Sequence, residues 1–207
     1  AILVDINLSV DPGTFIVVKG KVGAGKSALL YSILGEMEIL GSSKSTANLS
    51  SRRFDTNSSG TFQQAPSRDF DTTGHRTLVG SRIGGTVAFC NEMPFLRNES
   101  IRMNICMDIP HEDEWYDHVV AACALDKDFA GLPNGDMTIV GDRGVQLSGG
   151  QKARVALARA CYTNSDIYLL DGVLSALDVR VGKHIVEHVF HDLLLGKTII
   201  LTAHSGF

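Results

Sequence analysis

A glycine-rich octapeptide near the N-terminus constrains this chain more than any other feature. It reads Gly20-Lys21-Val22-Gly23-Ala24-Gly25-Lys26-Ser27 and fits the pattern G-x-x-x-x-G-K-[ST] at every fixed position. Its glycines let backbone N–H groups turn toward one anion, and a following helix adds its positive end. Lys26 is then placed to reach β- and γ-phosphates, and the Ser27 hydroxyl to bind Mg²⁺. The loop therefore predicts a site for a nucleoside triphosphate and its magnesium ion.

The segments on either side of this loop have strand and helix periodicity. Ile2–Val10 alternates apolar and polar residues, as a half-buried strand does, and Thr14–Lys19 is an apolar run typical of a buried strand. A helix is predicted after the loop. Its apolar stripe is made of Leu29, Leu30, Ile33, Leu34 and Met37.

Residues 42–82 interrupt this regular pattern with a tract rich in serine, threonine, asparagine and glycine. Such a tract buries too little apolar surface to offset the entropy lost on ordering. It is therefore predicted to be a disordered insertion within one domain that spans residues 1–207.

Strands and helices alternate again in the remainder of the chain. The predicted strands are Thr86–Cys90, Ile167–Leu170 and Lys197–Thr202, and the predicted helices are Ile101–Met107, Glu112–Ala124, Gly150–Tyr162 and Asp178–Leu195. The stretch Leu125–Leu147 is predicted to be irregular, with a turn at Pro133-Asn134-Gly135. This alternation predicts an α/β fold with a mostly parallel core sheet.

Two later motifs supply chemistry that the glycine-rich loop requires. A carboxylate on a neighbouring strand must hold the metal, and Asp171 follows an apolar strand directly. The second motif is Leu147-Ser148-Gly149-Gly150-Gln151, which stands where a helix begins. Two glycines and a serine at a helix N-terminus make a second anion-binding surface, and Ser148 is a candidate N-cap.

These motifs occur together with Ser175-Ala176-Leu177-Asp178 and a late His204, in an order and spacing that resemble an ABC-type ATPase domain. Segments such as GDRGVQLSGGQKARVALARA look most like the first of two ATPase domains in the multidrug-resistance-associated subfamily. The resemblance implies a P-loop NTPase fold with N-terminal antiparallel strands and a helical signature subdomain over residues 98–163. It also implies a domain cut at both ends from a longer protein.

The resemblance further implies how the site works. Two such domains close head to tail, so that Gly20–Ser27 holds one ATP while Ser148, Gly149 and Gly150 face an ATP on the partner. The flanking Leu147 and Gln151 belong to the same signature. Asp178 lies in the loop that crosses between the two sites, and His204 contacts the γ-phosphate. The implied partners are a second ATPase domain and the transmembrane domains of an exporter, at the cytosolic face of a membrane.

Two residues depart from the family pattern. Gly172 follows the metal-binding aspartate, where a glutamate normally polarises the attacking water, and glycine has no side chain with which to do so. Glu92 stands where the family has a glutamine that helps hold Mg²⁺, so it is a candidate metal ligand that adds negative charge. These departures predict a weakly hydrolytic site on this chain, whose signature serves the partner's ATP.

Composition excludes several other classes of function. A formal net charge of −4, without a dense basic run, gives no indication of a nucleic-acid partner. The four cysteines are widely spaced and are interpreted as core thiols. His184 and His188 have a metal-ligand spacing, but packing or solvation is favoured because no acid or cysteine ligand accompanies them. Lys152 and Arg154 either assist at a phosphate or lie on a solvated helix face.

Two alternative functions compete with ATP-driven export. A regulatory nucleotide sensor that gates a channel or receptor is favoured somewhat by Gly172 and Glu92. A soluble ABC protein that acts on ribosomes or chromosomes predicts basic surfaces or coiled-coil insertions, and the sequence contains neither. The export hypothesis is therefore preferred.

Overall fold

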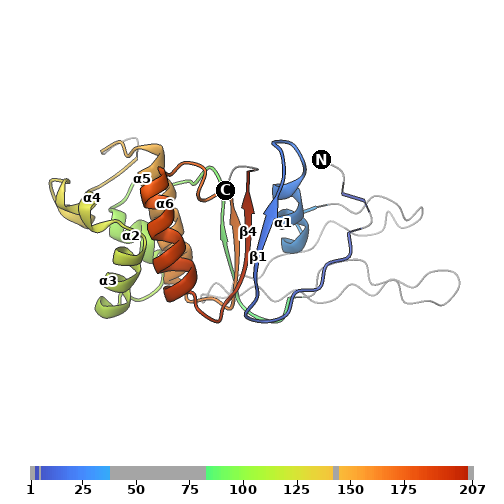
Figure 1. Ribbon diagram of the computed structural model, residues 1–207. Coiled ribbons are helices and arrows are strands. Elements are labelled where there is room, and N and C mark those ends of the chain that lie inside the picture. The colour runs from blue at the N-terminus through green and yellow to red at the C-terminus, as the bar shows by residue number, and fades with distance from the viewer. Residues whose placement is uncertain (1–2, 5, 38–82, 142–144, 205–207) are drawn as a thin grey trace, which may run out of the picture.

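The centre of the molecule is a parallel β-sheet with helices on both faces (Figure 1). The computed structural model describes residues 3–4, 6–37, 83–141 and 145–204. The strands are β1 (Phe15–Lys19), β2 (Val87–Cys90), β3 (Ile167–Asp171) and β4 (Thr198–Ala203). Their order across the sheet is β1-β4-β3-β2, and every neighbouring pair is parallel. The predicted α/β class is confirmed.

The helices are divided between the two faces of the sheet, as Figure 1 shows. The helix α1 (Lys26–Leu34) lies on one side. On the other side lie α2 (Ile101–Cys106), α3 (Asp113–Ala122), α4 (Asp126–Ala130), α5 (Gly149–Tyr162) and α6 (Val179–Ile185). A 3₁₀ helix covers Gly135–Met137, and α6 continues as a π-helix over Val186–Leu193.

The two central strands are buried along almost their whole length because both of their faces are covered. Alternate side chains point to opposite faces of a strand. Leu169 and Ile200 accordingly pack with Leu30 of α1 in one cluster. Tyr168 and Leu170 belong to the larger cluster that the other helices build. Two cores of unequal size therefore hold the sheet from both sides.

The register of the strands brings their carboxyl ends to one edge of the sheet. Asp171 pairs with Thr202, and Lys19 pairs with Ala203. Ligands of open α/β sheets bind outside this edge. The residues predicted from the sequence for this chain's own site lie at this edge, at the ends of the strands or directly after them.

The predicted N-terminal strand Ile2–Val10 is wrong for the residues that the structure describes, because residues 6–10 carry no strand and no antiparallel pairing. Val4, Ile6 and Leu8 are largely exposed. Their alternation predicts a strand only where another strand or a core covers the apolar face. The prediction that Thr14–Lys19 is buried also fails, since β1 is an edge strand with alternating exposure.

The observed helices differ from the predicted ones in two main places. Helix α1 ends at Leu34, where Gly35 takes a left-handed conformation, so Met37 falls outside the helix. The stretch Leu125–Leu147, predicted as irregular, contains α4 and the 3₁₀ helix, which are too short to show helical periodicity. The last helix, by contrast, is confirmed with Asp178 as its N-cap.

Two predictions about domain organisation are not tested. The insertion over residues 42–82 lies outside the described residues. Residues 98–163 carry α2 to α5, and their assignment as a separate signature subdomain stays a prediction.

The core packing gives a stability prediction with a matched control. Leu157→Ala truncates a side chain that is 1% exposed in α5, and we expect it to lower the free energy of unfolding by about 2–5 kcal/mol. Leu195→Ala removes the same atoms from a residue that is 77% exposed, and should cost less than about 0.5 kcal/mol. Denaturant unfolding of the two variants measures the difference, and equal losses would contradict the assigned core.

Candidate nucleotide-binding site

The glycine-rich loop connects the end of β1 to the start of α1. Gly23 and Gly25 have φ values of +80° and +90°, a left-handed conformation that side chains with a Cβ adopt only with strain. The Ala24 N–H donates to the Lys21 carbonyl over 3.2 Å and closes the turn. Helix α1 begins at Lys26, with Gly25 as its N-cap and no side chain capping it. Its first N–H groups are therefore presented to the loop, as anion binding requires.

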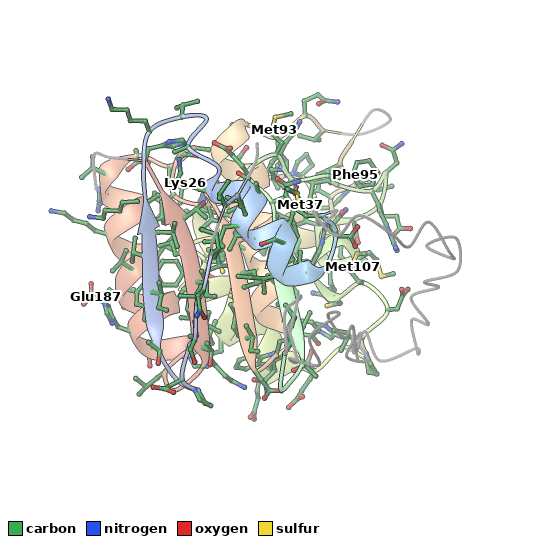
Figure 2. All side chains as sticks on the ribbon, turned by 90° about the vertical axis from the view of Figure 1, so that its right-hand side faces the viewer. Lys26, Met37, Met93, Phe95, Met107 and Glu187 are labelled. Carbon is green, nitrogen blue, oxygen red and sulfur yellow. The ribbon has the colours of Figure 1, made fainter. Side chains whose placement is uncertain are left out.

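The ammonium group of Lys26 lies inside the curve of this loop. Its Nζ donates to the carbonyl oxygens of Gly20 at 3.0 Å and Lys21 at 3.1 Å. The same nitrogen lies 3.5 Å from Nδ1 of His204, which follows β4. The long flexible side chain thus carries its charge back over the loop. Figure 2 shows Lys26 at the start of α1, at the same end of the molecule as Met93.

Asp171 is held in place at the end of β3 by its neighbour on β4. The Thr202 hydroxyl donates to Asp171 Oδ1 over 2.6 Å and accepts from the Gly172 N–H over 2.9 Å. Both side chains are almost completely buried. The orientation of the Asp171 carboxylate is therefore fixed, and so is the backbone that follows it. The sequence analysis did not identify Thr202 as a site residue. Its position near the end of a predicted strand, two residues before His204, could have indicated it.

The two residues that depart from the family pattern are in contact. Gly172 has a φ of +58°, and a Cβ built on it would lie 3.3 Å from both Cγ and Cδ of Glu92. The Glu92 Oε1 atom lies 3.5 Å from Nε2 of His204. The Glu92 carboxylate therefore lies beside the glycine that stands where a glutamate was expected.

Cys90 is buried at the end of β2, and burial raises the pKa of its thiol to about 12. The thiol therefore stays protonated.

The glycine-rich loop and the ends of β3 and β4 line one cavity of about 220 Å³ at the carboxyl edge of the sheet. Its walls combine the loop Val22–Ser27 with Glu92, Asp171, Thr202 and His204. Residues that are widely separated in the sequence are thus brought together, as predicted. The lining includes neither Ser148 nor its neighbours in the signature, so these belong to a different surface.

The signature forms the N-terminus of α5. Ser148 is its N-cap, as predicted, and accepts from the Gln151 N–H at 3.2 Å while Gln151 Oε1 accepts from the Ser148 N–H at 2.9 Å. This capping box fixes the first turn. A Cβ on Gly150 would lie 3.1 Å from the Ala176 carbonyl oxygen, so the close approach of that loop requires a glycine. Leu147 is buried and anchors the turn.

Asp128 supports the signature from α4, and sequence reasoning did not identify it. Its Oδ1 accepts from Nε2 of Gln151 at 3.0 Å, and its Oδ2 lies 2.8 Å from Nη1 of Arg154. Arg154 also donates to the Ala124 carbonyl. Neither predicted role for Arg154 is right, because its guanidinium is almost buried within the chain. The Gln151 side chain is likewise committed to the cap and to Asp128.

Asp178 ends the loop that follows Gly172 and starts α6. Its Oδ1 accepts from the N–H groups of Arg180 at 2.9 Å and Val181 at 3.0 Å. These bonds, that from Val181 above all, lower the pKa of the Asp178 carboxyl and keep it charged. The same loop is closed by Ser175, whose hydroxyl donates to the Gly172 carbonyl.

The remaining candidates are occupied by packing contacts. His184 lies 3.1 Å from the Ala121 carbonyl oxygen through Nε2, and its ring packs on His188 with 4.2 Å between centroids. The four cysteines are buried and free, as the interpretation as core thiols requires. In the ranges that the structure covers, no three histidine, cysteine or acidic side chains gather in a way suited to a metal.

The parallel sheet, the glycine-rich loop before α1 and the acid at the end of β3 define a P-loop nucleotide-binding domain. The sequence profile described as "ABC transporter" matches residues 3–175. The chain belongs to the ABC transporter family. Within the described ranges, no helix has both the length and the apolar character needed to cross a membrane.

The relatives with similar sequences are much longer proteins than this chain. The chain is 38% identical over 207 residues to ATP-binding cassette sub-family C member 2 of Mus musculus, an alignment that covers 99% of the chain and 11% of that protein. It is 40% identical over 205 residues to multidrug resistance protein mrp-7 of Caenorhabditis elegans, covering 98% and 11%. It is 38% identical over 201 residues to the oligomycin resistance ATP-dependent permease YOR1 of Saccharomyces cerevisiae, covering 97% and 11%. The chain thus spans about a ninth of the length of these relatives.

The geometry of the loop gives a direct binding prediction. We expect Lys26→Ala to weaken ATP binding by about 10- to 100-fold, because it removes hydrogen bonds between a charged donor and the phosphates. Lys183→Ala removes an equally charged side chain from the exposed face of α6 and should change affinity less than about threefold. Titration with a fluorescent ATP analogue measures both. Equal affinities of the two variants would show that Lys26 does not contact the nucleotide.

Proposed function

We propose that this chain binds ATP with Mg²⁺ on Gly20–Ser27 and acts as one of two ATPase domains that power export by a membrane transporter. The observation that carries the proposal is the single cavity in which the loop, Asp171 and His204 meet. The backbone N–H groups at the start of α1 bind the phosphates, with Lys26 on the β- and γ-phosphates and His204 at the γ-phosphate.

The metal would be held by residues of the same cavity. Ser27 and Asp171 offer a hydroxyl and a carboxylate, and oxygen donors of this kind are what Mg²⁺ prefers. Held there, Mg²⁺ would supply positive charge that offsets the charge developing on the phosphates. The Thr202 hydroxyl orients the carboxylate of Asp171 before the metal arrives. Glu92 as a further metal ligand stays a prediction, since its contacts are with His204 and Gly172.

Hydrolysis at this chain's own site is proposed to be slow. Gly172 leaves no carboxylate at the position from which the family polarises water, and the loss of a general base from that position costs about 10²–10⁴-fold. ATP would consequently remain bound here for longer than at a complete site.

The signature is proposed to serve an ATP on the second ATPase domain. Leu147–Gln151 lies outside the chain's own cavity, and its capped helix N-terminus is an anion-binding surface that a partner's γ-phosphate fits. Asp178 is the N-cap of α6 and ends the loop that starts at Gly172. The Ala176 carbonyl in that loop lies close to Gly150 of the signature. A head-to-tail pair of domains would therefore link the two sites.

The wider setting comes from the relatives, which include a permease and a multidrug resistance protein. We infer that transmembrane domains and a second ATPase domain accompany this one at the cytosolic face of a membrane, with no nucleic-acid partner. A second candidate function is a nucleotide sensor that gates a channel or receptor with little hydrolysis. The absence of a carboxylate at Gly172 favours it.

The asymmetric arrangement is tested by placing a bulky cation on the signature. We expect Ser148→Arg in the full-length protein to reduce ATP turnover to a slow residual rate, because it blocks the surface that faces the partner's ATP. ATP binding on Gly20–Ser27 should persist, as measured by photolabelling with an azido-ATP.

Leu195→Arg is the matched control, since it adds the same side chain at a position that is 77% exposed and outside both sites. Turnover should be unchanged in that variant. Full turnover in Ser148→Arg would contradict the role of the signature.

A further inference from the structure

Glu92 is a carboxylate of the cavity that lies between His204 and Gly172. Its Oε1 lies 3.5 Å from His204 Nε2, and its Cγ and Cδ lie where a side chain at position 172 would begin. The Glu92 side chain is 44% exposed, whereas Asp171 is 3% exposed and bonded to Thr202. Glu92 and Asp171 both line the cavity, but only the Glu92 side chain is also exposed to solvent.

The tautomer of His204 follows from its two neighbours. An ammonium group has donors and no acceptor, so the Nδ1 atom that faces Lys26 Nζ at 3.5 Å must be the acceptor nitrogen. In the neutral ring the hydrogen is then on Nε2, which faces Glu92 Oε1. His204 thus lies between the Lys26 ammonium and the Glu92 carboxylate, and its Nε2–H faces the carboxylate as a donor.

The glycine at position 172 makes this arrangement possible. A Cβ at Gly172 would lie within 3.3 Å of Glu92, closer than most real contacts, and the left-handed φ of +58° disfavours a side chain there. A glutamate at 172 would compete with Glu92 for the same space and would place a second negative charge beside it. The two departures from the family pattern are therefore one coupled change.

We propose that Glu92 is the catalytic residue that orients the attacking water in the slow turnover of the ATP held on Gly20–Ser27. The inference rests on the proposed function, because it requires ATP in this cavity. The water oxygen forms a bond to the γ-phosphorus while the bond from that phosphorus to the β–γ bridging oxygen breaks. The electron pair of the broken bond remains on the β-phosphate of ADP. Glu92 accepts the proton of the water and returns it to solvent, to which its side chain is open.

The test isolates the slow site in the full-length protein. The Ser148→Arg variant serves as the parent, since it silences the partner's ATP and leaves turnover on Gly20–Ser27. Release of radiolabelled phosphate is measured with enzyme in excess over ATP. We expect Glu92→Gln, which keeps the shape and an acceptor for His204, to slow this turnover by about 10²-fold or more.

The same variants are titrated with ATP and with Mg²⁺, which separates water orientation from metal binding. Half-saturating concentrations of both should change less than about threefold in Glu92→Gln, because the proposed role requires no contact with the metal. The matched control is Glu187→Gln, the same change at an exposed position away from Lys26 (Figure 2), and it should leave turnover at the parent rate. The double variant Gly172→Glu/Glu92→Gln should turn over at least about tenfold faster than Glu92→Gln, because it places a carboxylate at position 172 in exchange for the one removed at position 92.

Three results would overturn the inference. They are a parent without turnover above the rate in protein-free buffer, a Glu92→Gln variant that turns over at the parent rate, and a Glu92→Gln variant that needs at least about tenfold more Mg²⁺ to bind ATP. A parent and variants that bind no ATP at all would instead refute the proposed function on which the inference rests.

Discussion

The register between β3 and β4 is the constraint on which the site depends. It sets Asp171 opposite Thr202, so that one hydroxyl donates to the carboxylate and accepts from the Gly172 backbone. A slip of one residue would send every side chain of either strand to the other face of the sheet and break both bonds. The same register places His204 one residue beyond the strand, within reach of Lys26 and Glu92. Burial of both strands on two faces makes such a slip costly, and so the core protects the geometry of the cavity.

The sequence predicted the central part of the fold because its signals there are local and strong. The apolar runs of β3 and β4 identify strands buried on both faces, and the loop around Gly25 identifies the strand–loop–helix unit. Prediction failed where a segment's state depends on what covers it. Ile2–Val10 alternates like a strand without a strand beside it in the described part of the chain, and β1 is exposed because it lies at an edge.

The residues that share the cavity were predicted where a motif names them, and missed where only the fold brings residues together. The cavity unites Lys26, Asp171 and His204 as expected. Thr202 and Asp128 have no motif of their own, since their roles arise from the register of the sheet and from the position of α4. The contact between Glu92 and Gly172 could not be foreseen either, because the two positions lie far apart in the sequence, on segments that follow different strands. Two departures that look independent in the sequence are neighbours in space.

The central claim is that a nucleotide binds at the carboxyl edge of this sheet, on Gly20–Ser27. The most direct measurement is a structure of the full-length protein with Mg²⁺ and a non-hydrolysable ATP analogue. Our account predicts phosphates on the loop amides and on Lys26, the metal between Ser27 and Asp171, and a second domain's signature over the γ-phosphate. A nucleotide bound elsewhere on the chain, or an empty loop at saturating nucleotide, would contradict it.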